Sequence, residues 1–318
     1  MIDVDMYNEV LGLGKVRQEV LRRSVFSMLP LEAEPTLDGG TISMGGRAVI
    51  AHSPSIGVPL DALGFFAFHY AASNVAARFA RPKHLVTGIY LPLKTKEKEL
   101  RTITSVLGEE ARKFGVTVVA GQTATYYGLE IPLVTTTCFG EPVRQPENPQ
   151  PGDIVMIVGA VGGEAVWLKA LSQEARDEVW REFTPLRAAL RLQDVEGTKL
   201  MHDVSEGGVK KALGEVAEAT GVRVEVDTDE MFYVEGVKEL GQDILRAPTY
   251  GALIVLAEPG AEDETRRVCG ELEIPIASAG FIKEGAGVYV DGEKVEAFAR
   301  IALDEIYGSF EREGSKQG

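Results

Sequence analysis

The sequence has few of the residues that build disulfide frameworks or metal clusters. Its 318 residues include two cysteines, Cys138 and Cys269, which excludes a disulfide framework and a cysteine-rich metal site. The four histidines are scattered, and no two of them stand at metal-ligand spacing. Cys138 stands in a strand-like stretch and Cys269 in a helix-like one, so we expect both to be buried as small hydrophobic side chains.

Basic residues and long apolar runs are scarce as well. Lys and Arg total 33 against 48 Asp and Glu, a formal net charge of -15. Such a surface repels phosphate backbones, so we expect no nucleic-acid partner. No apolar run approaches the roughly 18 residues of a membrane span, and the opening MIDVDMYNEV lacks the features of a signal peptide. We therefore expect a cytoplasmic protein with no membrane partner.

What is present is a mixed succession of helix and strand patterns in two halves. The stretch LDALGFFAFHYAASNVAARFA, about residues 60–80, is apolar or small on nearly every side and predicts a helix that is buried all round. Four prolines within 140–152 interrupt both helix and sheet and predict a linker. The sequence thus predicts an α/β (α+β) protein with an N-terminal domain at 1–145, a C-terminal domain at 146–308 and a flexible tail at 309–318. Further strands are expected at 46–53, 116–120, 129–139, 251–257 and 274–280, a helical region at 162–192 and a hairpin at Asp291–Gly292. A helix is also expected with the apolar face Leu100, Ile103, Leu107, Ala111 and Phe114, ended by Gly115.

The phrase MHDVSEGGVKKALGEVAEATGV, residues 201–222, contains a local puzzle. Gly207 and Gly208 open a helix, although each glycine costs about 1 kcal/mol relative to alanine inside a helix. One interpretation is close packing against a neighbouring segment, with Ser205 as an ordinary N-cap. The other is a ligand that approaches the backbone, where free N–H groups favour negative charge. The local residues favour neither interpretation.

Two further glycine-rich segments carry weaker signals. Lys15 follows Gly12 and Gly14 at the start of a predicted amphipathic helix at 15–29, but the full phosphate-loop pattern is missing. Lys15 is therefore either an exposed lysine at a helix start or a contact for an anionic ligand. The segment IVGAVGGEAVW, residues 157–167, lacks the Rossmann spacing and is typical of a tight strand-to-helix turn.

The order of several phrases resembles the AIR synthase (PurM-like) superfamily, and more narrowly the hydrogenase maturation factor HypE and its archaeal relatives. The phrase HDVSEGGV matches the second-domain signature of the family. Three first-domain phrases of the family are matched in the same order by GKVRQEVLRRSVF, ASNVAARFARP and VTVVAGQT. The resemblance spans about residues 11–307. It implies a two-domain PurM-like fold, with an N-terminal domain that contributes strands to a dimeric β-barrel and a C-terminal α/β sandwich. It also implies a homodimer and an ATP cleft near the dimer interface.

The resemblance places ligand contacts at a set of positions in both halves: Lys15, His52, Ser53, Asn74, Gln122, Thr123, Asp203, Glu206, Gly207 and Gly208. Several of these positions are acidic in family members and hold magnesium there. In this sequence they are neutral, with His52 or Ser53, Asn74 and Gln122 in place of aspartate and Gly46–Arg47 at a further acidic position. Magnesium prefers carboxylate oxygens. ATP is therefore the cofactor that the resemblance implies, whereas a magnesium site is not expected.

These departures lead to a functional hypothesis with open alternatives. We expect a dimeric HypE-like protein whose ATP-type cleft has lost or rebuilt its metal chemistry, and which acts by binding, by regulation or by an altered reaction. One alternative is an active ATP-dependent phosphotransferase or synthase of metallocofactor maturation or of purine- or thiamine-type metabolism. Another is a scaffold that keeps only the dimer. No cysteine follows Cys269, so the reaction of HypE on its own C-terminal cysteine is not expected. The sequence identifies neither catalytic residues nor a substrate.

Overall fold

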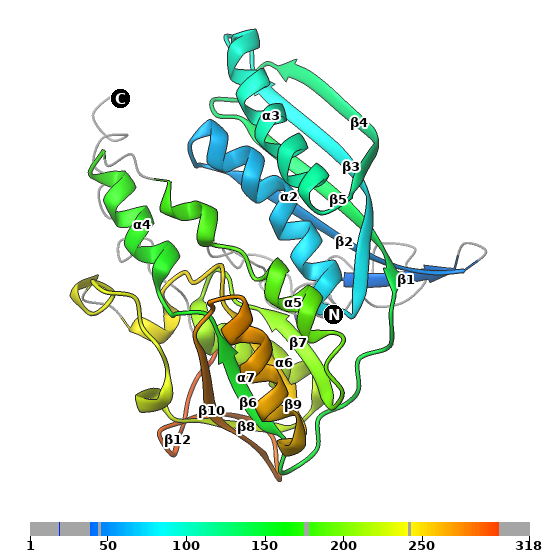
Figure 1. Cartoon of the computed structure of the whole chain (residues 1–318). Coiled ribbons are helices and arrows are strands. Elements are labelled where there is room, and N and C mark those ends of the chain that lie inside the picture. Colours follow the sequence, from blue (N-terminus) through cyan, green and yellow to red (C-terminus); the bar gives the residue numbers. More distant parts are fainter. Residues whose placement is uncertain (1–18, 20–38, 44–45, 175–177, 241–242, 299–318) are drawn as a thin grey trace, which may run out of the picture.

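The computed structural model describes residue 19 and residues 39–43, 46–174, 178–240 and 243–298 (Figure 1). Lys15, most of the helix predicted at 15–29 and the tail predicted at 309–318 lie outside the described residues. Two mixed sheets, one in each half of the chain, form the described fold.

The N-terminal sheet has five strands in the order β1-β2-β5-β3-β4, and helices α2 and α3 cover one of its faces (Figure 1). Strands β3 and β4 are parallel, whereas the other neighbouring strands are antiparallel. Along β5, every second residue from Val134 to Gly140 is buried against the helices, and the alternate residues face outward. The elements are β1 (Gly39–Ser43), β2 (Arg47–Ile56), α2 (Leu60–Ala77), β3 (Ala80–Pro92), α3 (Glu97–Lys113), β4 (Thr117–Tyr126) and β5 (Leu133–Pro142).

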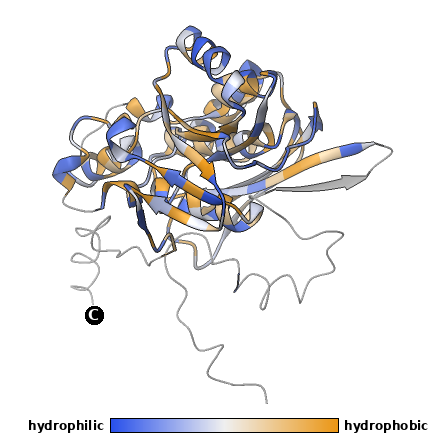
Figure 2. Cartoon of the chain, turned by 90° about the horizontal axis from the view of Figure 1, so that it is seen from below, coloured by the Kyte–Doolittle hydropathy of each residue, from blue (hydrophilic) through white to orange (hydrophobic). Residues whose placement is uncertain are grey.

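Strand β2 extends beyond the body of the molecule when the chain is seen from below, and its projecting part is mainly hydrophobic (Figure 2). No helix of the described ranges lies on the other face of the N-terminal sheet. We refer to it as the open face.

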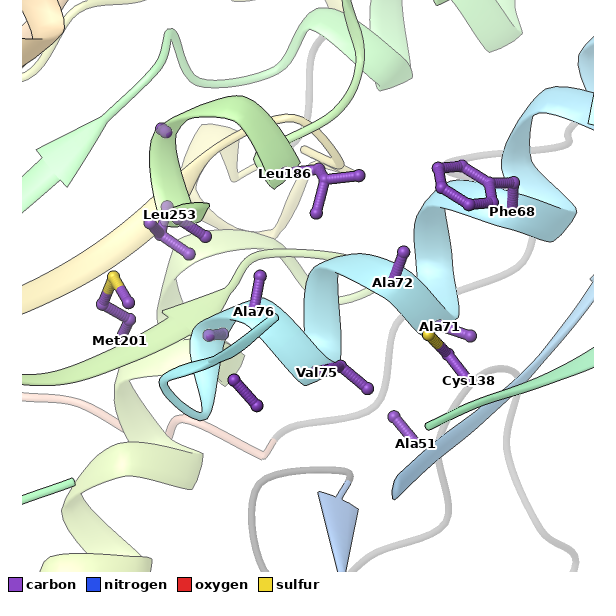
Figure 3. Packing of buried hydrophobic residues seen from close by; sticks show 14 of the residues in the cluster. Ala51, Phe68, Ala71, Ala72, Val75, Ala76, Cys138, Leu186, Met201 and Leu253 are labelled. Carbon is purple, nitrogen blue, oxygen red and sulfur yellow. The ribbon is translucent and has the colours of Figure 1, made fainter. Parts of the chain in front are cut away.

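Helix α2 is the centre of the molecule. Fifteen of its 18 residues are buried, which confirms the predicted helix without a solvent-exposed face. Toward the N-terminal sheet it packs near Ala51 and Cys138, and toward the second half it packs near Leu186, Met201 and Leu253 (Figure 3). These residues belong to a single hydrophobic cluster, so one core joins the two domains.

The C-terminal domain is built on a seven-stranded sheet in the order β12-β11-β8-β10-β6-β9-β7. Every residue of β6, β7 and β9 is buried, because helices cover both faces of the sheet. One cluster joins α5 and α7 to one face of the sheet, and a second joins α6 to the other. The strands are β6 (Ile154–Val158), β7 (Thr198–Asp203), β8 (Arg223–Val226), β9 (Leu253–Ala257), β10 (Ile276–Lys283), β11 (Gly287–Val290) and β12 (Glu293–Lys294). The α-helices are α4 (Gly163–Ser172), α5 (Leu186–Leu192), α6 (Gly208–Thr220) and α7 (Glu262–Glu271), and short 3₁₀ helices include η3 (Val179–Glu182) and η6 (Ile244–Arg246).

Several local predictions are confirmed. The hairpin turn lies at Asp291 and Gly292, which both have positive φ and join β11 to β12. Cys138 and Cys269 are both buried. None of the helices among the described residues has the length and hydrophobicity needed to cross a membrane.

Several predicted boundaries differ from the structure, and those of β5 and β4 have a clear physical reason. Strand β5 continues to Pro142, which pairs with Ala80 at the sheet end, so the linker begins later than the first proline. Strand β4 continues through Gln122 and Thr123 to Tyr126, beyond the strand predicted at 116–120. It continues because a Cβ atom at Gly121 would lie 2.5 Å from Thr87 Oγ1, so the glycine allows the strand to approach β3 closely.

Candidate functional site

Asn74 lies on the side of α2 that faces strand β2. Its side chain amide Nδ2 donates to Ser53 Oγ over 3.5 Å, and the residue is only 6% exposed. The carbonyl oxygen Asn74 Oδ1 is buried, and no residue in the described part of the chain hydrogen-bonds to it. An unpaired buried oxygen costs about 1–3 kcal/mol. Asn74 Oδ1 therefore marks a position that favours a hydrogen-bond donor from outside the described chain.

His52 lies next to Ser53 in sequence but on the opposite face of the sheet, because side chains alternate along a strand. It is exposed on the open face, where its Nδ1 lies 2.8 Å from Thr137 Oγ1. The structure thus brings Ser53 to Asn74 and directs His52 away from both.

Gln122 and Thr123 lie on the edge strand β4, where both are exposed. Gly121 faces Thr87, a residue buried on the helix-covered face, so Gln122 points to the open face. Within one chain, Gln122 is therefore separated from Asn74 by the sheet.

Asp203 ends strand β7, which packs against α2 from the second domain. It is 5% exposed. The preceding residue, His202, places its Nε2 2.8 Å from Glu215 Oε2 and its Nδ1 3.8 Å from Asp203 Oδ1. The His-Asp phrase thus holds a carboxylate at the boundary between the two domains.

Tyr250 connects the two sides of this boundary. Its hydroxyl lies 3.0 Å from Ser73 Oγ, one residue before Asn74. Burial raises the pKa of Tyr250 well above its ordinary value, and the negative charges of Asp203 and Glu164 raise it further. Tyr250 is therefore a neutral phenol that lies near Asp203 and hydrogen-bonds to α2.

Glu164 contributes a second buried acid from the first turn of α4. Its Oε2 accepts a hydrogen bond of 2.8 Å from the backbone N–H of Tyr250, and the residue is 9% exposed. Burial raises the pKa of Glu164 to about 7, with a further contribution from the charge of Glu206. Near neutral pH this carboxyl exchanges its proton readily, a property common among site residues.

Sequence reasoning missed Glu164, Tyr250 and Ser73. The signal available for Glu164 was the turn at Gly162–Gly163 just before it, where Gly162 has a φ of +89°. That turn was interpreted as structural. Nothing in the neighbouring sequence indicates that Tyr250 meets Ser73, because 177 positions separate them.

Glu206, Gly207 and Gly208 form the entry to α6. Glu206 is exposed and its Oε2 accepts from Ser205 Oγ at 3.0 Å, so Ser205 does not cap the helix as predicted. Gly207 is the N-cap, with a φ of +89°. A Cβ atom at Gly208 would lie 2.5 Å from Leu245 O, which shows close packing against the chain's own backbone. The close-packing interpretation thus accounts for Gly208.

The donor set around Asn74 is neutral on the N-terminal side. Asn74 and Ser53 supply dipoles without charge, whereas magnesium in proteins is held by carboxylates and phosphates. In the described ranges no three His, Cys, Asp or Glu side chains gather in a way that would hold a metal ion. The donors at Asn74 and Ser53 therefore do not fit a magnesium ion by themselves.

Two family comparisons cover most of the chain. Residues 40–141 match the N-terminal domain of AIR synthase related proteins, and residues 150–293 match their C-terminal domain. The chain belongs to the AIR synthase related proteins. The family resemblance of the sequence is thereby confirmed. The matched ranges lie on either side of the linker and include the phrases around Asn74 and Asp203.

Individual relatives of this AIR synthase related protein are distant. The thiamine-monophosphate kinase of Pyrococcus horikoshii is 27% identical over 254 residues, which are 74% of this chain and 76% of that protein. The carbamoyl dehydratase HypE of Escherichia coli is 26% identical over 217 residues, 64% of each chain. Among solved structures, the hydrogenase maturation protein HypE in complex with ATP superposes with a TM-score of 0.71 at 20% identity, covering 93% of this chain and 98% of that one. These likenesses confirm the two-domain PurM-like fold.

Proposed function

We propose that this AIR synthase related protein binds ATP at the boundary between its two domains, near Asn74 and Asp203, with little dependence on magnesium. The observation that carries the proposal is the buried, unpaired Asn74 Oδ1. The residue stands on the central helix of a fold whose solved members include a HypE in complex with ATP. In this proposal the protein acts by binding ATP, by a regulatory role that depends on this binding, or by a reaction that differs from the metal-dependent ATP chemistry of the family.

The expected hydrolysis is slow or absent. Phosphoryl transfer depends mainly on positioning and on metal ions that neutralise the transferred charge. Ser53 and Asn74 are neutral, and Gln122 of the same chain points to the open face. A site with fewer carboxylates binds divalent ions less well, but it also repels the phosphates of ATP less.

A second candidate function is that of an active ATP-dependent phosphotransferase or synthase, such as the two relatives of thiamine and hydrogenase cofactor metabolism. The acids of the C-terminal side favour it: Asp203 and Glu164 are buried near Tyr250, and Glu206 is close enough to raise the pKa of Glu164. In this alternative the acids of the second domain take over the role of those missing from the first.

We also propose a homodimer in which the open faces of two N-terminal sheets meet as a β-barrel. Two large apolar side chains on the open face support this: Ile56 of β2 is 50% exposed and Tyr126 of β4 is 43% exposed. Exposed apolar patches of this kind mark interaction surfaces.

The proposed function is tested by thermal unfolding with ATP, ADP and AMP, each with magnesium and with EDTA. A ligand at 100 times its Kd stabilises the folded state by about 2.7 kcal/mol. We expect ATP to stabilise the protein to the same degree with magnesium and with EDTA. We expect Asn74→Asp to make this stabilisation magnesium-dependent, because the variant adds a buried carboxylate beside Ser53.

Asn148→Asp is the matched control, because it adds the same charge at an exposed linker position. It should leave the binding of ATP unchanged. Robust magnesium-dependent ATP turnover by the unmodified protein would contradict the proposal and support the active enzyme. An absence of any nucleotide effect on unfolding would contradict both.

A further inference from the structure

Glu164 is a buried acid that no basic side chain of the described residues neutralises. It stands in the first turn of α4 and is 9% exposed. Within the described ranges its carboxyl receives one hydrogen bond and forms no ion pair. The donor is an uncharged group, the backbone N–H of Tyr250, which lies 2.8 Å from Glu164 Oε2. One neutral donor solvates a negative charge poorly, so these surroundings favour the protonated form of the carboxyl.

The backbone on both sides of Glu164 is anchored to the segment before β9. The N–H of Gly162 donates to Thr249 Oγ1 over 3.0 Å, and the N–H of Ala165 donates to Pro248 O over 3.0 Å. Together with the hydrogen bond of the carboxyl itself, these bonds hold the first turn of α4 in place at the boundary between the domains. The carboxyl is therefore a fixed charge whenever it is ionised.

A single tyrosine side chain separates Glu164 from the candidate site. The backbone N–H of Tyr250 contacts Glu164, and the hydroxyl at the other end of the residue lies 3.0 Å from Ser73 Oγ. Ser73 directly precedes Asn74, whose Oδ1 is buried and unpaired. The ring of Tyr250 is packed edge-on against Tyr70, with 4.4 Å between the ring centroids. A packed aromatic ring screens a charge far less than water does, so the charge of Glu164 is felt at the site.

Two titratable groups of the described chain act on Glu164 or are acted on by it. One is the phenol of Tyr250, which is neutral because burial raises its pKa well above the ordinary value. The other is Glu206, an exposed acid at the entry to α6. Burial, and to a smaller extent the charge of Glu206, raises the pKa of Glu164 to about 7. At neutral pH the free protein therefore contains both protonation states of Glu164.

We propose that Glu164 takes up a proton from solvent when ATP binds at the candidate site. The phosphates of ATP carry negative charges, which an ionised Glu164 repels and a protonated Glu164 does not. Bound ATP therefore favours the protonated carboxyl, and the protonated protein binds ATP more tightly to the same degree. Glu164 needs no contact with the nucleotide, because its charge acts across Tyr250. This inference rests on the proposed function and specifies how pH regulates that site.

Calorimetric titration with ATP measures the proton directly. The full-length protein and Glu164→Gln are titrated in the presence of EDTA at about pH 7.5, in HEPES and in Tris, because the difference in observed enthalpy between two buffers counts the protons that are taken up. We expect the unmodified protein to take up about 0.5 proton more than Glu164→Gln, the value for a carboxyl pKa that ATP raises by about one unit. The comparison with the variant cancels the proton equilibria of ATP itself.

The same coupling predicts the pH dependence of the affinity. At pH 6 the carboxyl is mostly protonated, so the unmodified protein and Glu164→Gln should bind ATP equally. At pH 8.5 it is ionised in the free protein, and the Kd of the unmodified protein should exceed that of the variant roughly sevenfold. Glu196→Gln is the matched control, because it removes an exposed carboxylate. It should behave as the unmodified protein does in both measurements.

Infrared difference spectra provide a measurement that does not depend on a variant. When ATP is released from a caged precursor in the unmodified protein, the carbonyl band of a protonated carboxyl should grow and a carboxylate band should shrink. Absence of this change, or equal proton uptake by the unmodified protein and folded Glu164→Gln, would overturn the coupling and leave the binding of ATP intact. A protein that binds no ATP would overturn the proposed function and this inference together.

Discussion

Glu164 shows how a single residue couples the site to the stability of the whole chain. Its carboxyl is buried among groups that cannot solvate a negative charge well, and the hydrogen bond from the Tyr250 N–H compensates only in part. The pKa of about 7 in the folded state exceeds the ordinary value of 4.5. A raised carboxyl pKa means that the folded state binds the proton more tightly than the unfolded state does.

The free energy of unfolding should therefore fall as the pH rises from about 4.5 to 7, by up to about 3 kcal/mol from this residue. Glu164→Gln keeps the acceptor for Tyr250 and removes the titration, so we expect it to flatten this pH dependence and to be the more stable protein above pH 7. Urea unfolding between pH 4.5 and 8.5 measures the effect. Glu196→Gln removes an exposed carboxylate and should behave as the unmodified protein does. An unaltered slope in Glu164→Gln would show that the carboxyl is solvated.

At the scale of elements, the entry to α6 is determined by packing of the chain against itself. Gly208 has a φ of +61°, and a Cβ atom there would lie 2.5 Å from Leu245 O and 2.6 Å from Ala247 O. These carbonyls belong to η6 and the residue after it, the segment that leads to Tyr250. The glycine thus sets the distance between α6 and the segment that carries a site residue.

Gly208→Ala should destabilise the protein by about 2–4 kcal/mol, because the left-handed backbone and the overlap with two carbonyl oxygens both disfavour a side chain. Gly260→Ala is the matched control, since nothing lies within 4 Å of a Cβ atom at that position. It should change the free energy of unfolding by less than about 0.5 kcal/mol. Chemical denaturation of the two variants measures the difference. Equal stabilities would contradict the packing interpretation of Gly208.

Elements with a strong composition or turn signal could be predicted from the sequence, and residues that meet only in the folded chain could not. The all-apolar stretch predicted α2, and Asp291–Gly292 predicted the last hairpin. The extent of β4 was missed because its pairing depends on the contact of Gly121 with Thr87 on another strand. Likewise, the partnership of Ser73 and Tyr250 depends on the docking of two domains, for which a single sequence carries no local pattern.

At the scale of the molecule, an aromatic cluster holds the two domains together. Phe65 and Phe66 of α2 pack against Trp180 of η3, and Phe66 also contacts Trp167 of α4 and Tyr250. The core around α2 (Figure 3) and this aromatic cluster together make the domain boundary a packed interior. The groups at the candidate site are therefore placed by a rigid boundary between the domains.

Among the described residues, no element covers the open face of the N-terminal sheet, and this predicts the assembly of two copies. Ile56 is 50% exposed near the end of β2, on the outward side of that strand. An arginine there would place a charge in the proposed barrel, where burial without a partner is costly. We expect the unmodified protein to sediment as a dimer at micromolar concentration and Ile56→Arg to sediment as a monomer. Phe281→Arg is the matched control, because Phe281 is 48% exposed on β10 of the other domain. It should leave the dimer intact. A monomeric unmodified protein, or loss of the dimer in Phe281→Arg alone, would contradict assembly through the open face.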